Sequence, residues 1–255
     1  MKTIYVCNDH ITGIFSAIYD AWKDRKGENE CGIALKGMVE LQLFCDYQEV
    51  EESEKKAIVV ERFIQKHLGG NAYRNIYHAV LSPSKEKGDA ILGTMLAAKK
   101  ISDSTKIMEH FSHPWVEKVF KLSRAVADEA HLLTGFLRFR ELENGILYAQ
   151  ITPKAQVLTC LAPHFADRLP MENWIIHDLT HRMFVVHEAG KRWILFWAEG
   201  VNMEIFNRLS KEEEGYEKLW TGFCKTIAIE SRQNKGCQLQ HLPLRFRPNM
   251  VEFVI

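Results

Sequence analysis

The segment at residues 112–133, SHPWVEKVFKLSRAVADEAHLL, has the clearest periodicity in the chain. Its larger apolar side chains recur at intervals of three or four residues, and they are Trp115, Val119, Leu122, Val126, Ala130 and Leu133. This spacing places them on one face of an α-helix. Pro114 suits the first helical position, and Ser112 or His113 can cap it. The pattern therefore predicts a long amphipathic helix that packs its apolar stripe against a core.

The period changes to two after Gly135. The stretches FLRFREL and ILYAQI both alternate, and Glu143-Asn144-Gly145 separates them. Because Asn-Gly readily supplies the positive φ angles of a tight turn, these residues predict a β-hairpin. On its first strand, Phe136, Arg138 and Arg140 would share one face. We expect that face either to be solvated or to offer its arginines to phosphate groups, with Phe136 available for stacking.

The remaining patterns predict a mixed α+β fold. A strand at TIYVC, a helix that Asp9 or Thr12 could cap and that carries the apolar residues from Ile14 to Trp22, and a strand at MVELQLF open the chain. Helical signals then dominate residues 51–100. A helix broken or kinked at Pro163 comes next. Three strands at WIIHD, MFVVHEA and RWILFWAE and a helix at KEEEGYEKLWTGFCKTIAIES follow. The fold class is therefore a helix-rich N-terminal region followed by a mainly antiparallel sheet of about five strands flanked by helices. The expected boundaries are 1–110 and 111–255, with a single compact unit as the alternative.

Charge and cysteine content limit the functional classes. Lysine and arginine together equal aspartate and glutamate at 33 each, so attraction to nucleic acid or acidic lipid must come from local patches. The six cysteines form no CxxC pair, which argues against a zinc or iron–sulfur site and against a disulfide framework. No apolar run approaches the roughly 20 residues that span a bilayer, and the start is not a signal peptide. We expect a cytoplasmic protein with free thiols and no membrane contact.

Local excesses of basic residues are the strongest candidates for a binding site. Residues 225–247 contain five lysines and arginines against one acid, Glu230, and amide side chains lie among them. Such mixtures bind phosphates and base edges. The predicted nucleic-acid-binding residues are Lys118, Lys121, Arg124, Arg138, Arg140, Arg232, Asn234, Lys235, Gln238, Arg245 and Arg247. The alternative is that these cations are solvated, or pair with the acids near residues 51–54 and 212–217.

The sequence gives no reaction. It contains no nucleophile elbow, no phosphate-binding glycine loop and no HExxH motif. His177 and His181 are four residues apart, but they fall on a predicted strand and turn, where that spacing does not converge on a metal. Asp128 and Glu129 are interpreted as surface acids of the long helix. We expect no metal and no cofactor, and whether the chain is an enzyme stays open.

The stretches FSHPWVEKVFKLSRAVADEAHLLTGFLRFRELENGILYAQITP and IAIESRQNKGCQLQHLPLRFRPNMVEF, together with APHFADRLP and WIIHD, carry a family resemblance. With these the chain resembles a bacterial family described as DNA-metabolism or DNA-repair proteins. The resemblance implies a context in which members accompany a DNA-modifying radical S-adenosylmethionine protein. In some lineages a similar domain is fused to a uracil-DNA-glycosylase-like domain. We expect this chain, which ends at Ile255, to obtain any such chemistry from a partner.

Together these observations predict a DNA-binding or adaptor component of a repair or modification system. Two alternatives stay open: an enzyme that acts on a nucleobase or nucleotide, and a scaffold that binds only the radical S-adenosylmethionine protein. The resemblance implies no catalytic residue.

Overall fold

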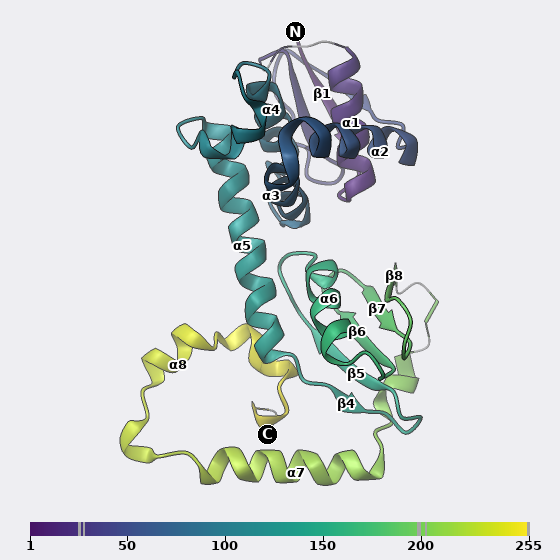
Figure 1. Cartoon of the computed structure of the whole chain (residues 1–255), viewed down its shortest axis with the longest axis vertical. Helices are drawn as coiled ribbons and strands as arrows, with labels where there is room; N and C mark the ends of the chain where they lie inside the picture. The colour runs from purple at the N-terminus through teal and green to yellow at the C-terminus, as the bar shows by residue number, and fades with distance from the viewer. Residues whose placement is uncertain (25–26, 28, 198–199, 202, 254–255) are drawn as a thin grey trace. The chain divides into compact units, whose positions relative to one another are not determined.

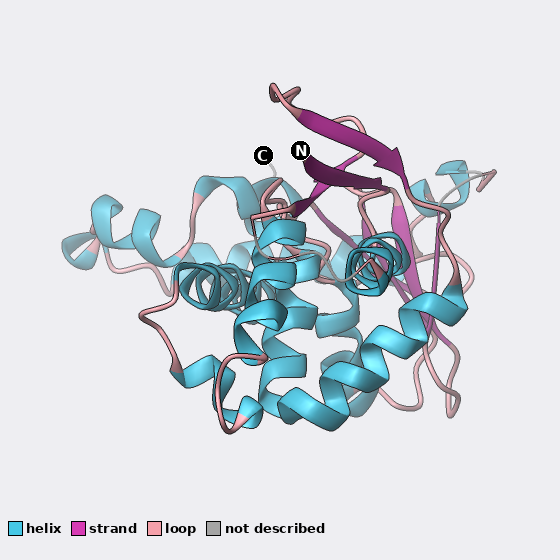
Figure 2. Ribbon diagram, turned by 90° about the horizontal axis from the view of Figure 1, so that it is seen from above, coloured by secondary structure: helices cyan, strands magenta, loops and turns pink. Residues whose placement is uncertain are grey.

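The computed structural model describes residues 1–24, 27, 29–197, 200–201 and 203–253. The chain divides into two compact units, Met1–Asp128 and Glu129–Ile255. Helices and strands both contribute to the fold (Figure 2). The long helix α5 (Pro114–Phe136) runs across the boundary between the units in the sequence.

The first unit contains a three-stranded parallel sheet in the order β2-β1-β3. The strands are β1 (Lys2–Cys7), β2 (Cys31–Leu35) and β3 (Cys45–Glu49), and α1 (Ile11–Lys23) connects β1 to β2 (Figure 1). β1, which contains the apolar run TIYVC, is the central strand and pairs with β2 on one side and β3 on the other. An apolar run suits this position, because the strands of a parallel sheet are covered on both faces.

Helices supply most of the core of the first unit. They are α2 (Glu54–Phe63), the short π-helical segment η1 (Ile64–Leu68), α3 (Gly69–Leu81), α4 (Lys87–Ala98) and the 3₁₀ segment η2 (Ser104–Glu109). α4 is buried along almost its whole length. Its Gly93 lies against the Trp115 indole so closely that a Cβ would be 2.2 Å from the ring atom Cδ1. This contact fixes α4 on the first turn of α5.

The predicted apolar stripe of α5 is confirmed. Val119, Val126 and Leu133 are buried, as is Ala130. Trp115 and Leu122 are partly buried and pack against the core of the first unit. The unbroken spacing was therefore a reliable guide to the buried face.

The strand expected at MVELQLF is wrong. Residues 38–42 form no strand, and β3 begins only at Cys45, after Phe44 with φ of 62°. Leu41, Leu43 and Phe44 are almost fully exposed. Alternation is a local pattern, whereas a strand also needs a neighbouring backbone, and here β1 pairs with the next five residues instead.

The second unit is built on a five-stranded sheet in the order β4-β5-β6-β7-β8. The strands are β4 (Arg140–Glu141), β5 (Leu147–Ile151), β6 (Trp174–Asp178), β7 (Met183–His187) and β8 (Ile194–Trp197). Only β5 and β6 pair in parallel, through the crossover helix α6 (Leu158–Arg168), and the other neighbours are antiparallel. The predicted fold class, a mixed α+β protein with a mainly antiparallel sheet of five strands, is confirmed.

The predicted hairpin is present but shorter. α5 continues through Gly135 to Phe136, so β4 has only two residues. Gly145, with φ of 78°, makes the turn into β5. The prediction that Phe136, Arg138 and Arg140 share a strand face is therefore wrong. Phe136 ends the helix and packs against Phe246, with ring centroids 5.3 Å apart.

After the sheet, the chain continues into an extended helical segment (Figure 1). It comprises η3 (Met203–Asn207), α7 (Lys211–Thr226), η4 (Glu230–Arg232), α8 (Lys235–His241), η5 (Leu244–Asn249) and η6 (Val251–Phe253). α7 and α8 bury no residue. η5 returns to the end of α5, where Phe246 is buried. The final helix thus ends earlier than predicted, and the basic tail is ordered as short helices.

Candidate nucleic-acid-binding site

A cavity of about 660 Å³ lies in the second unit between the sheet, α7 and the C-terminal 3₁₀ segments. Its lining combines cationic, amide and aromatic side chains, and includes Arg138, Arg140, Tyr148, Gln150, Phe206, Asn207, Lys218, Lys225 and Asn249. Glu214 and Glu217 are its acidic members. The cavity therefore joins residues that are more than 100 positions apart in the sequence.

The sheet wall is formed by one face of β4 and β5. Arg140 pairs with Tyr148 across the two strands, and Gln150 follows two residues later on the same face. Phe206 from η3 stacks on Tyr148, with ring centroids 4.4 Å apart and an interplanar angle of 12°. This packing fixes the Tyr148 ring in the floor of the cavity.

A hydrogen-bond chain holds the polar groups of this wall. Gln150 donates from Nε2 to Tyr148 Oη at 2.9 Å, and Tyr148 Oη lies 2.8 Å from His177 Nδ1. Tyr148 Oη has two lone pairs, so it accepts from Gln150 and can either donate to or accept from His177 Nδ1, according to the tautomer of the imidazole. Burial raises the pKa of Tyr148 and lowers the pKa of His177, so both are neutral near pH 7. The part of the wall formed by Tyr148 and Gln150 is therefore polar without being charged.

The two arginines of the cavity are paired with acids. Arg138 Nη2 lies 2.8 Å from Glu252 Oε1, and Arg140 Nε lies 2.5 Å from Glu217 Oε1. Arg138 also donates to the Gly135 carbonyl oxygen at 2.8 Å. The acidic α7 residues were the alternative partners expected for these cations, and Glu217 is one of them.

One face of α7 forms the opposite wall. Lys218, Thr221, Gly222 and Lys225 line the cavity, and their spacing of three, four and seven residues places them on the same side of the helix. Among the described residues, neither Lys218 nor Lys225 forms a salt bridge. These two lysines are exposed and carry the charge that the cavity offers to a ligand.

The predicted residues of the tail divide into two groups. Arg232, Lys235 and Gln238 are exposed on η4 and α8. Asn234 is exposed as well, but its side chain accepts from the Cys237 N–H at 3.0 Å and caps α8. These residues are accessible to a ligand outside the cavity.

Arg245 and Arg247 face the protein instead. Arg245 Nη1 lies 2.8 Å from Glu129 Oε1, and Arg247 Nη2 donates to the Leu242 carbonyl oxygen at 3.2 Å. The Arg247 guanidinium also lies 4.9 Å from the centre of the Phe253 ring. The interpretation of Glu129 as a surface acid was wrong, because this carboxylate is buried and accepts the Lys154 and Ala155 N–H groups.

The remaining predicted cations belong to the first unit and pair there. Lys118 pairs with Glu86, Lys121 with Glu117 at 2.5 Å, and Arg124 with Asp128 at 3.8 Å. All three lie on the exposed side of α5, so the pairs are weak and leave the lysines and arginine accessible.

Sequence reasoning missed Lys218, Gln150 and Asn249, and it counted Lys225 in the basic stretch 225–247 without naming it as a binding residue. The signal for the lysines was their seven-residue spacing on the final helix, on the side away from its apolar residues. Nothing local indicated that this side would lie opposite β5, because the approach of α7 to the sheet is a tertiary contact.

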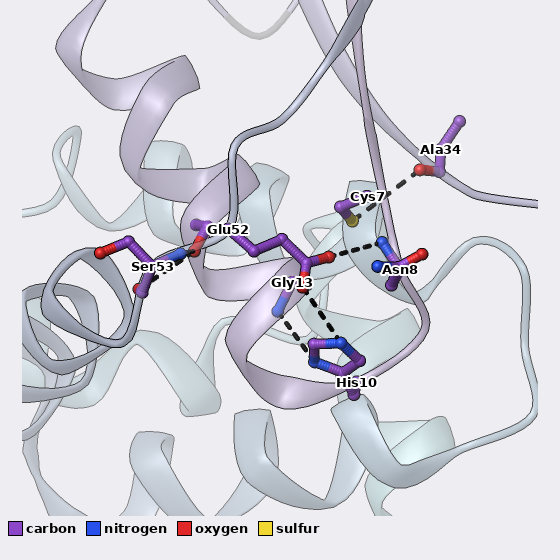
Figure 3. Close-up of polar contacts among 8 residues, drawn as sticks. Cys7, Asn8, His10, Gly13, Ala34, Glu52 and Ser53 are labelled. Carbon is purple, nitrogen blue, oxygen red and sulfur yellow. Dashed lines mark hydrogen bonds and ion pairs between the residues drawn. The ribbon is translucent and has the colours of Figure 1, made fainter.

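A second polar cluster lies at the carboxyl end of β1 in the first unit (Figure 3). His10 caps α1 by accepting the Gly13 N–H on Nδ1 at 3.2 Å, and its Nε2 lies 3.1 Å from Glu52 Oε2. Glu52 Oε1 accepts the Asn8 N–H at 2.9 Å. A Cβ on Gly13 would lie 2.5 Å from the Asn8 carbonyl oxygen, so the helix meets the strand without a gap. We interpret this cluster as structural, because its members satisfy one another.

The described residues contain no group of three or more His, Cys, Asp or Glu side chains arranged to hold a metal ion. His177 and His181 lie on β6 and in the following turn, as the sequence indicated, and His181 Nδ1 is 2.6 Å from Asp178 Oδ2. Among the helices that the structure describes, none has the length and apolar character needed to span a membrane.

The model of a family described as a domain of unknown function, DUF4130, matches residues 85–252. No curated protein matches the chain. The matched range contains α4, α5 and nearly all of the second unit, including every residue that lines the cavity.

Proposed function

The chain belongs to the DUF4130 family of unknown function, and on that premise we propose that it is a nucleic-acid-binding accessory protein of DNA repair or DNA metabolism. The observation that carries the proposal is the cavity of the second unit, where two lysines of α7, without a salt bridge to any residue that the structure describes, face amide and aromatic groups. Lysines bind phosphates, and amides hydrogen-bond to base edges.

The charge distribution favours nucleic-acid binding at one local site over attraction by the whole surface of the protein. The protein has no net charge, so a phosphate is attracted only where cations lie within about 8–10 Å of it. Lys218 and Lys225 provide such a group, and the exposed Arg232 and Lys235 add cations further along the same helical segment. Arg245 and Arg247 are not part of this surface in the proposal, because they bind within the protein.

A protein partner is the second part of the proposal. Leu219, Phe223 and Ile227 are 70%, 52% and 58% exposed, and their spacing puts them on the side of the α7 segment away from the lysines. An exposed apolar stripe of this kind fits the groove of another protein. The family resemblance suggests that the partner is a radical S-adenosylmethionine protein and that both act in the cytoplasm.

Fluorescence anisotropy with a labelled single-stranded oligonucleotide tests the nucleic-acid part. We expect Lys218→Gln with Lys225→Gln to weaken binding and to reduce the slope of log K against log salt by about 0.7 for each lost phosphate contact. Lys211→Gln is the matched control, because Lys211 is an exposed lysine of α7 that does not line the cavity. Equal affinity and slope in both variants would exclude the cavity lysines as the binding site.

The partner is tested by size-exclusion chromatography with a purified radical S-adenosylmethionine protein from the same genome. We expect a complex that Leu219→Glu with Phe223→Glu abolishes while DNA binding persists. Release of a free base or nucleotide during incubation with damaged oligonucleotides would instead favour an enzyme.

A further inference from the structure

We propose that the cavity of the second unit accepts a single unpaired nucleotide, so that the protein selects DNA in which a base is unstacked. This inference rests on the proposed nucleic-acid binding and specifies the form of the ligand. The volume of the cavity, about 660 Å³, falls within the range of roughly 300–1,000 Å³ that is typical of small-molecule sites. A cavity of this size is too small for a duplex.

The two walls differ in the chemistry that they offer. The α7 wall presents Lys225, which has no acidic residue three or four positions away on the helix. The sheet wall presents the neutral groups of Gln150 and Tyr148 beside Arg140, whose charge is paired with Glu217. A nucleotide has the same division, with an anionic phosphate at one end and a neutral, hydrogen-bonding base at the other.

The amides of the sheet side are held in place. Gln150 donates to Tyr148 Oη, and Asn249 Nδ2 donates to Thr152 Oγ1 at 3.1 Å. Each amide therefore spends one N–H on the protein and keeps its carbonyl oxygen and second N–H for another partner. Fixed amides of this kind read the edge of a base that has left its stack.

The acids of the cavity limit the ligand to one phosphate. Glu214 lies four residues before Lys218 on the α7 face, and Glu217 binds Arg140. A phosphate near Lys225 avoids Glu214, whereas a backbone that continued along α7 would meet its carboxylate and be repelled. The positive end of the cavity is therefore the end at Lys225.

Gly222 provides a way to close the cavity without removing a charge. It lines the cavity beside Lys225, and a Cβ built on it meets nothing within 4 Å, so a leucine side chain at this position would project into the open space. Gly215 lies on the same helix, also has nothing within 4 Å of its Cβ position and does not line the cavity. Gly222→Leu and Gly215→Leu therefore form a matched pair with the same effect on helix propensity.

The experiment measures binding of three probes by fluorescence anisotropy: a 12-nucleotide single strand, its duplex, and the duplex with one unpaired bulge nucleotide. We expect the wild type to bind the single strand and the bulged duplex at least about tenfold more tightly than the perfect duplex, the scale of one base contact. Gly222→Leu should remove that preference, and Gly215→Leu should keep it. Circular dichroism of both variants establishes that α7 is folded.

The outcomes separate this inference from the proposed function. If the wild type binds none of the probes, the proposed nucleic-acid binding fails. If it binds all three equally, or if Gly222→Leu behaves as the wild type while the lysine variants lose affinity, nucleic-acid binding stands and the unpaired-nucleotide site is overturned.

Discussion

Arg245 and Glu129 form a partly buried ion pair that joins the two ends of the second unit, with the Arg245 side chain 34% exposed. The Arg245 guanidinium lies 2.8 Å from a carboxylate that is 6% exposed, and the same carboxylate accepts two backbone N–H groups after β5. This pair ties η5 to α5 and to the sheet. It explains why a basic segment of the tail packs against the protein.

Removing one partner of this pair should destabilise the second unit. We expect Arg245→Met to lower the free energy of unfolding by about 3 kcal/mol, because it leaves the Glu129 charge buried without a counter-ion. Urea denaturation measures the loss. Arg232→Met, at an exposed arginine without a salt bridge among the described residues, should change stability by less than about 0.5 kcal/mol. Equal effects of the two substitutions would show that the pair is not structural.

The contact between Gly93 and Trp115 predicts intolerance of a single methyl group. We expect Gly93→Ala to cost about 1–3 kcal/mol, because the new Cβ would overlap the buried face of the indole. Gly70→Ala is the control, since its Cβ meets nothing within 4 Å and the change removes backbone freedom from the unfolded chain. In thermal unfolding, the melting temperature should therefore fall for Gly93→Ala and stay level or rise for Gly70→Ala.

Cys7 should be inert to alkylation in the folded protein. Burial, reinforced by the nearby carboxylates of Glu52 and Asp9, raises its pKa to about 12, so the thiolate is scarce at pH 8. Iodoacetamide treatment followed by peptide mass spectrometry should label the exposed Cys237 and spare Cys7. Labelling both in denaturant provides the control, and rapid labelling of Cys7 in the native protein would contradict its burial.

The buried His177 should make the second unit sensitive to acid. Burial lowers the pKa of His177 below its ordinary value of 6.5, so the unfolded chain binds a proton that the folded chain does not. The contribution of His177 to stability is thus present above about pH 6.5 and is lost as the pH falls below it. We expect the melting temperature to fall less between pH 7.5 and pH 5.5 in His177→Gln, whose amide can donate to or accept from Tyr148. His78 has a pKa shifted in the same direction and is unchanged in both proteins, so the difference isolates His177. If the melting temperatures of the wild type and His177→Gln fall in parallel with pH, His177 does not cause the acid sensitivity.

The sequence predicted the elements with strong local signals. α5 and the strands β6 and β7 lie where their patterns indicated, because apolar spacing follows directly from which side of an element is buried. β8 also lies where it was predicted, although all four of its residues are exposed. The strand at MVELQLF failed although its alternation was equally regular. Its side chains are exposed because β1 pairs with CDYQE instead, and that choice depends on contacts far away in the sequence.

The candidate site was only partly predictable, because some of its residues stand out locally and others depend on contacts far away in the sequence. Arg138 and Arg140 were identified as unusual among phenylalanines, and both line the cavity. In the sequence, Lys218 and Lys225 look like ordinary lysines on a solvated face of a helix. Only the tertiary structure shows that α7 and the sheet line the same cavity. Arg245 resembled a free cation because its partner Glu129 is 116 positions away. Charge alone therefore could not separate a structural arginine from a binding one.

The single parallel pair in the sheet determines how the second unit assembles. β6 and β7 are joined by a four-residue turn and can pair within microseconds, as hairpins do. We expect β5 to join β6 later, because the crossover between them, which contains α6, is a longer loop whose closure costs more chain entropy. β5 carries Tyr148 and Gln150, so the cavity is completed late in folding. During refolding, ligand binding should consequently appear only when the sheet is complete, later than the formation of the individual helices and hairpins.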